Sequence, residues 1–187
     1  MKPSTVKVGL ICTRGLPARY GAFEQAADQL VKYSENISKH SISFFVPCIP
    51  QVAEEPYAVD NVVRRGVARH ESGAGTILYG LMSFFWCYSQ GCRKFIFFGY
   101  ALAPFFWLFS MMGCDLICNV DGIEWRRAKW SGFARKFLKF CEMCAAKSKA
   151  RLIFDASAIG RYFQMHHNVI GNQIFYGTEE LNFQKMI

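Results

Sequence analysis

The chain has 187 residues, of which 52% are hydrophobic and 19% charged, a balance that excludes a disordered polypeptide and suits one globular domain. Its formal net charge is +8, and the segment from Arg126 to Arg151 holds nine basic residues against one acid, Glu142. A basic patch on an otherwise neutral body indicates a local anionic partner such as a phosphate, a lipid headgroup or a nucleic acid. The alternative is a solvated helix face.

Strand-like and helix-like segments alternate along the chain. Strands are predicted over Val6–Cys12, Ile42–Val46, Val62–Arg69, Phe95–Phe98, Asp115–Val120, Arg151–Asp155 and Gln173–Phe175. Helices are predicted over Ala22–Tyr33, Thr76–Gln90, Ala103–Met112, Gly132–Lys149 and Ser157–Gln164. Strands that are apolar throughout are covered on both faces, so this order predicts an α/β, Rossmann-like domain of three layers around a mostly parallel sheet.

An uncharged run of twenty residues, Phe95–Cys114, admits a second interpretation, because it is long enough to span a bilayer. Gly99, Pro104 and Gly113 interrupt the run, and a strand, a loop and a helix explain the same residues. A transmembrane segment is therefore kept as the alternative.

The eight cysteines lie in or beside apolar runs, where a reduced thiol behaves as a small hydrophobic side chain. Residues Met1–Lys7 lead directly into a strand-like run and do not resemble a secretory signal, so we expect a reducing, cytoplasmic compartment. Cys141 and Cys144 form a C-x-x-C pair, but no second pair follows at zinc spacing. We expect no metal site.

Ligands of open parallel sheets collect in the loops beyond the carboxyl ends of the strands. The loop Thr13–Glu24 places two glycines and two arginines before a helix N-terminus, where backbone N–H groups favour an anion such as phosphate. Its glycine spacing matches neither the dinucleotide fingerprint nor the P-loop, which disfavours a nicotinamide dehydrogenase or a nucleoside triphosphatase. An ordinary connecting loop is the alternative.

The loop Asn119–Trp130 has the densest polar chemistry of the chain. Its charged and aromatic residues are Asp121, Glu124, Trp125, Arg126, Arg127, Lys129 and Trp130. The aspartate is placed to accept a proton or a hydrogen bond from a hydroxyl, the cations can pair with phosphates, and the indoles offer flat faces to sugar rings. The alternative is that the acids and cations pair with one another and only shape the loop.

Three segments resemble the signatures of a bacterial group within glycosyltransferase family four, the rhamnosyltransferase-like enzymes of polysaccharide biosynthesis. Arg14–Glu24 reads R-G-L-P-A-R-Y-G-A-F-E and is similar to the first loop of that group, with Ala22 in place of a glycine. Asn119–Trp130 looks like its second signature, and Ile153–Ser157 is similar to its strand-plus-Asp-Ser segment. The resemblance spans essentially the whole chain.

The resemblance implies a GT-B architecture, in which two Rossmann-like domains face each other across a cleft. Residues 1–187 would be the N-terminal, acceptor-side domain, with the C-terminal, donor-binding domain missing. By position, Asp121 would be the catalytic residue beside the transferred sugar. The substrate-binding residues would be Arg14, Gly15, Tyr20, Gly21, Glu24, Glu124, Trp125, Arg126, Arg127 and Lys129. Family members retain anomeric configuration and need no metal or other cofactor besides the nucleotide-sugar donor.

The resemblance also implies transfer of a sugar, with rhamnose as the candidate, to a polysaccharide or to an acceptor carried by polyprenyl diphosphate at the inner membrane face. We expect the 187 residues to be inactive alone, and the basic, aromatic helix Gly132–Lys149 to rest on anionic headgroups. The alternative is a non-catalytic accessory domain that pairs with a separate donor-domain chain. No nucleic-acid motif supports nucleic acid as a partner.

Overall fold

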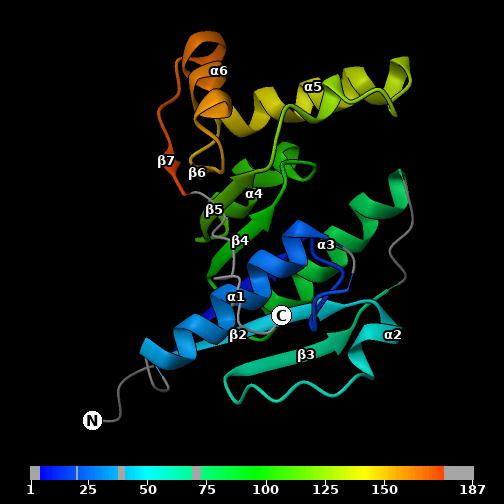
Figure 1. The fold of residues 1–187 in the computed structure, drawn as a ribbon, viewed down its shortest axis with the longest axis vertical. Helices are drawn as coiled ribbons and strands as arrows, with labels where there is room; N and C mark the ends of the chain where they lie inside the picture. The colour runs from blue at the N-terminus through cyan, green and yellow to red at the C-terminus, as the bar shows by residue number, and fades with distance from the viewer. Residues whose placement is uncertain (1–4, 20, 38–40, 69–72, 175–187) are drawn as a thin grey trace, which may run out of the picture.

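The computed structural model describes residues 5–19, 21–37, 41–68 and 73–174 (Figure 1). Within these residues, one sheet has the strand order β3-β2-β1-β4-β5-β6-β7, and every neighbouring pair is parallel. The strands are β1 (Val6–Ile11), β2 (Ile42–Cys48), β3 (Val62–Gly66), β4 (Lys94–Phe98), β5 (Asp115–Val120), β6 (Arg151–Phe154) and β7 (Asn172–Gln173). The chain adds strands on one side of β1 and then on the other, so the order reverses between β1 and β4.

The helices cover both faces of the sheet. They are α1 (Ala22–Ile37), α2 (Pro50–Ala53), α3 (Ala74–Ser89), η1 (Ala103–Phe105), α4 (Phe106–Met111), η2 (Glu124–Arg126), α5 (Gly132–Lys147) and α6 (Ser157–His167). Crossovers between parallel strands are right-handed, so α1 and α2 cover one face while α3, α4, α5 and α6 cover the other. In Figure 1, β3 and α2 lie at one end of the sheet and α5 and α6 at the other.

The predicted α/β, Rossmann-like fold is confirmed, with a sheet that is parallel throughout. The segment predicted as one helix, Ala103–Met112, is divided into η1 and α4, and Pro104 lies in the first of these. The short helices α2 and η2 were not predicted, because each is a single turn in a polar loop and has no apolar period. Arg69 and Phe175, at the ends of two predicted strands, lie outside the described residues.

An aromatic cluster forms the core between β4, α3 and α4. Phe84 of α3 and Phe109 of α4 stack with their ring centroids 3.6 Å apart, and both contact Phe97 of β4. All three side chains are fully buried. The uncharged run Phe95–Cys114 is therefore β4, η1, α4 and their connections, and its interpretation as a transmembrane segment is wrong. No helix in the described parts of the chain is long and apolar enough to cross a membrane.

The loop after β1 is held by packing. Gly15 has a φ of 115°, and a Cβ atom at this position would lie 2.5 Å from Sγ of Cys48 in β2. The next residue, Leu16, is fully buried, and its carbonyl oxygen accepts a hydrogen bond from Nη1 of Arg64 at 2.7 Å. The first glycine of the loop is thus required by the close approach of the loop to β2.

We expect Gly15→Ala to lower the free energy of unfolding by on the order of 1–3 kcal/mol, because alanine adds both a strained φ and a collision with Cys48. Denaturant unfolding measures the change. Gly132→Ala is the matched control, since Gly132 has open space around its Cβ position. Equal stability of the two variants would contradict the packing role of Gly15.

Candidate functional site

The two signature segments leave the same edge of the sheet, on either side of β4. Residues 14–24 follow β1 and residues 119–130 overlap the end of β5, and both strands pair with β4. The ring of Phe23 lies 5.8 Å from that of Phe98, and Oη of Tyr100 accepts a hydrogen bond from the backbone N–H of Glu124 at 2.7 Å. Both segments therefore contact the residues at the end of β4 and lie at the same, carboxyl edge of the sheet.

A hydrogen bond within the first segment holds its conformation. Glu24 is buried, and its Oε1 accepts a hydrogen bond from the backbone N–H of Arg14 at 3.0 Å. This predicted substrate-binding carboxylate thus holds the loop in shape. Gly21 is exposed at the start of α1, where backbone N–H groups favour anions. Tyr20 lies outside the described residues.

The second segment is organised around Glu124. Its carboxylate lies 3.0 Å from Nη1 of Arg127, 3.0 Å from Nζ of Lys129 and 3.1 Å from Nε1 of Trp130. Burial by itself would raise the pKa of Glu124, but the hydrogen bonds from these three groups outweigh it, and the pKa lies below its usual range. Internal pairing, the alternative interpretation of this loop, is therefore confirmed for Arg127 and Lys129.

A buried carboxylate anchors the rest of the second segment. Trp125 donates from Nε1 to Oε2 of Glu142 in α5 at 2.8 Å, and Glu142 is 1% exposed. The other carboxylate oxygen accepts from Oη of Tyr162 at 2.9 Å and lies 2.9 Å from Nε2 of His167. The guanidinium of Arg126 lies over the rings of Trp125 and Tyr162, at 5.2 and 5.1 Å from their centroids. Trp125 and Arg126 are therefore fixed against α5 and α6.

Asp121, the predicted catalytic residue, follows β5 directly and is partly buried. Burial raises its pKa, the charge of Glu124 raises it further, and Arg127 and Lys129 act in the opposite direction. A carboxylate with a raised pKa is a better proton acceptor near neutral pH. Asp121 can thus accept a hydrogen bond or a proton from a hydroxyl at this edge.

A second carboxylate, Asp155, lies at the end of the neighbouring strand β6 and was not among the predicted site residues. Burial raises its pKa, and the charge of Asp121 raises it further. Within the described ranges, Oδ1 of Asp155 and Oγ1 of Thr13 are buried without a hydrogen-bond partner. The sequence could have pointed to Asp155 as a site residue. It directly follows a predicted strand, and it lies in the segment Ile153–Ser157 that resembles the family.

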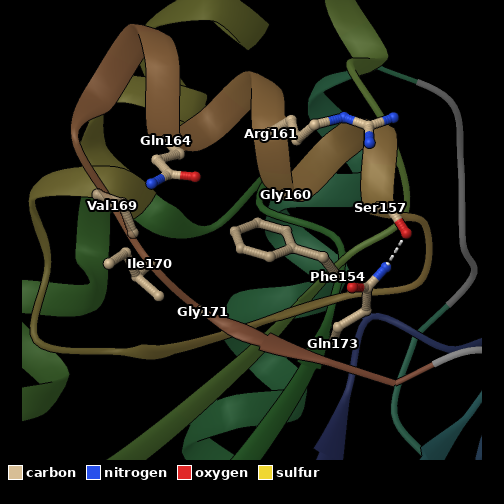
Figure 2. Close-up of a pocket in the computed structure, with 9 residues that line it drawn as sticks. All are labelled: Phe154, Ser157, Gly160, Arg161, Gln164, Val169, Ile170, Gly171 and Gln173. Carbon is tan, nitrogen blue, oxygen red and sulfur yellow. Dashed lines mark hydrogen bonds between the residues drawn. The ribbon is translucent and has the colours of Figure 1, made fainter.

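A pocket of about 320 Å³ lies between α6 and β7 (Figure 2). Its lining includes Phe154, Ser157, Arg161, Gln164, Gly171 and Gln173. Figure 2 shows the ring of Phe154 near its centre and the hydrogen bond from Nε2 of Gln173 to Oγ of Ser157, which is 2.6 Å long. None of the predicted site residues lines it, so this pocket is separate from the loops Arg14–Glu24 and Asn119–Trp130.

The thiols and acids of the described residues do not converge on a metal. No group of three or more His, Cys, Asp or Glu side chains in this part of the chain could hold an ion. All eight cysteines are free thiols, and six of them are buried. Burial raises the pKa of Cys141, in the C-x-x-C pair, to about 12 and thereby keeps the thiol protonated.

A family model described as a domain of unknown function, DUF1972, matches residues 5–179. The chain belongs to this family. No curated protein matches its sequence significantly.

The DUF1972 chain is similar in structure to sucrose-phosphate synthase from Thermosynechococcus elongatus, with a TM-score of 0.69 and 12% sequence identity. The alignment covers 92% of the DUF1972 chain and 48% of the synthase, so the chain spans about half the length of that protein. At this identity the likeness establishes the fold, a Rossmann-like domain that matches one half of a GT-B glycosyltransferase.

We expect Asp121→Asn to raise the unfolding temperature of the DUF1972 chain at pH 7, by roughly 2 °C. The raised pKa means that the folded chain binds this proton more tightly than the unfolded chain, so ionised Asp121 destabilises the fold at neutral pH. The gain should shrink as the pH falls below the usual pKa of an aspartate, where Asp121 is protonated in both states. Thermal unfolding across this pH range measures it.

Asp60→Asn is the matched control, because Asp60 is exposed outside the site and its replacement should leave the unfolding temperature unchanged. A lower unfolding temperature for Asp121→Asn at pH 7 would contradict the expectation, since it would show that the ionised carboxylate stabilises the folded chain.

We expect Glu142→Ala to lower the free energy of unfolding by about 3 kcal/mol, because Trp125 and Tyr162 would be left with partly buried donors that have no acceptor. Denaturant unfolding provides the measurement, with Glu54→Ala on the exposed surface as the control. A loss no larger than that of the control would show that the buried network contributes nothing to stability.

Proposed function

We propose that the DUF1972 chain is the N-terminal, acceptor-side half of a GT-B glycosyltransferase of the rhamnosyltransferase-like group. The observation that carries the proposal is that two segments resembling the family signatures flank the end of β4. The strand order of the sheet reverses there, and this is the position at which open α/β sheets bind ligands. The match to about half of a sucrose-phosphate synthase supports the same assignment.

In the proposed reaction, Asp121 accepts a hydrogen bond from a hydroxyl of the transferred sugar or of the acceptor, and its raised pKa suits it to take the proton. Arg127 and Lys129 bind phosphate oxygens. Their side chains are 57% and 53% exposed, so they retain donors beyond those that Glu124 uses. Because Glu124 already fixes both cations, little side-chain entropy is lost when a phosphate binds.

The proposed donor is a nucleotide sugar, with rhamnose as the transferred group, and the acceptor is a sugar carried by polyprenyl diphosphate. The first loop, with Arg14, Gly15, Tyr20 and Gly21, contributes the other phosphate contacts at the start of α1. A second Rossmann-like domain binds the donor, as expected of a chain that aligns with half of a GT-B enzyme. Residues 1–187 then catalyse no transfer on their own.

An accessory domain that pairs with a donor-domain chain without taking part in the chemistry is the second candidate. The pairing of Glu124 with Arg127 and Lys129 favours it, because the loop is held together without a ligand. The two candidates differ in what they predict for Asp121.

We expect sugar transfer from a labelled nucleotide sugar to a polyprenyl-diphosphate acceptor only when the chain is joined to a donor-binding domain. Asp121→Asn should then lower kcat by about 10²- to 10⁴-fold, because the proton acceptor is lost. Asp60→Asn, outside the site, should leave kcat unchanged.

If Asp121→Asn leaves the kcat of the joined protein unchanged, the chain is the accessory domain and Asp121 takes no part in the chemistry. Transfer by residues 1–187 alone, or no transfer from any nucleotide sugar by the joined protein, would contradict the proposed half-enzyme.

A further inference from the structure

The pocket between α6 and β7 has a polar part and an apolar part. The polar part is formed by Ser157, Arg161 and Gln173, and the apolar part by Val169 and Ile170 (Figure 2). Among the described residues that line the pocket, one is a cation and none is an acid. Ligand pockets range from about 300 to 1,000 Å³. A volume of about 320 Å³ therefore admits a ligand with a single ring, and the charge of the lining favours an anion.

The polar part offers donors that the described protein residues do not use. Nε2 of Gln173 donates to Oγ of Ser157 at 2.6 Å, which ties β7 to the first turn of α6 and leaves the hydroxyl proton of Ser157 available to a ligand. Within the described ranges, the guanidinium of Arg161 and the side-chain amide of Gln164 have no hydrogen bond or ion pair. A guanidinium can bind both oxygens of a carboxylate through two parallel N–H donors.

Gly160 keeps space open above Phe154 at the floor of the pocket. It lies inside α6, where glycine makes a helix less stable than alanine does. The structure around Gly160 does not require a glycine, because a Cβ atom there would lie 3.4 Å from Cδ2 of Phe154, which is an ordinary contact. At Gly171, by contrast, a Cβ atom would lie 2.6 Å from the carbonyl oxygen of Leu152. Packing thus explains Gly171, whereas the open pocket explains Gly160.

The charges and the apolar wall of the pocket select the kind of anion. One guanidinium balances the single negative charge of a carboxylate, but it would leave part of the charge of a phosphate monoester unpaired. Ile170 is 86% exposed, and a hydrocarbon ring bound beside it would remove apolar surface from water. The ligand that fits both parts is a carboxylate joined to an apolar ring.

We propose that the pocket between α6 and β7 binds a small organic monocarboxylate, with the carboxylate paired to Arg161 and the apolar body against Val169 and Ile170. The carboxylate also accepts hydrogen bonds from the neutral donors Ser157 and Gln164. The inference concerns a site apart from the loops Arg14–Glu24 and Asn119–Trp130, and it does not depend on sugar transfer.

The test is an NMR titration of the full 187-residue chain with phenylacetate, followed through the backbone amide signals of α6 and β7. We expect a Kd on the order of 1 mM, as is usual for a ligand of about ten non-hydrogen atoms. Phenylacetamide has the same shape without the charge and should bind at least tenfold more weakly. Phenyl phosphate should bind no more tightly than phenylacetate, because the pocket has one cation for its two charges.

Arg161→Gln should weaken the binding of phenylacetate at least tenfold, because the charge-assisted hydrogen bonds are lost. Arg65→Gln is the matched control, since Arg65 is exposed on β3 at the other end of the sheet. This control removes the same charge from the chain and should bind phenylacetate as the unaltered chain does.

Gly160→Ala should weaken the binding roughly tenfold, because the added methyl group takes up the space above Phe154. Its unfolding temperature should stay the same or rise, since alanine favours the helix, so the loss of binding does not come from unfolding. Gly132→Ala, with open space around its Cβ position at the start of α5, is the matched control and should leave binding unchanged.

Three results with the unaltered chain would overturn the proposal: no shift of the α6 and β7 signals with phenylacetate, equal binding of phenylacetamide, or tighter binding of phenyl phosphate. Unchanged binding in Arg161→Gln or Gly160→Ala would also overturn it, as would an equal loss in Arg65→Gln.

Discussion

The burial of β4 is the constraint on which the rest of the structure depends. Phe95 and Phe97 of this strand lie in ring contact with Phe84 of α3, and β4 pairs with β1 on one side and β5 on the other. The end of the same strand carries Phe98 and Tyr100, which hold the two signature segments. The aromatic packing that stabilises the domain thus also sets the distance between the two signature segments.

Three carboxylates of the site region have different tasks because their surroundings differ. Glu142 is buried and saturated by donors, and it fixes the position of Trp125. Glu124 is 23% exposed and pairs with two cations. Asp121 has no comparable compensation, and its pKa is raised. A carboxylate held at a cost to stability, between neighbours that are well satisfied, is typical of a functional position.

The second signature segment leads directly into α5. This helix begins at Gly132, two residues after the second signature segment ends at Trp130. Glu142 and Lys139 tie its inner side to Trp125 of that segment, while its phenylalanines point the other way. The buried network would keep α5 and the loop in one arrangement.

The sequence by itself determined the strands, the longer helices and the two loops, because continuous apolar runs and punctuating glycines and prolines are local signals. It also pointed to Asp121, since the carboxyl ends of parallel strands share one edge. Only the tertiary structure decided that Glu124 binds Arg127 and Lys129 and that Glu142 binds Trp125. It also placed Asp155 close enough to Asp121 for the charge of Asp121 to raise the pKa of Asp155. Pairing and burial depend on distances across the fold, and a pattern of residue types contains the candidates for a contact without choosing among them.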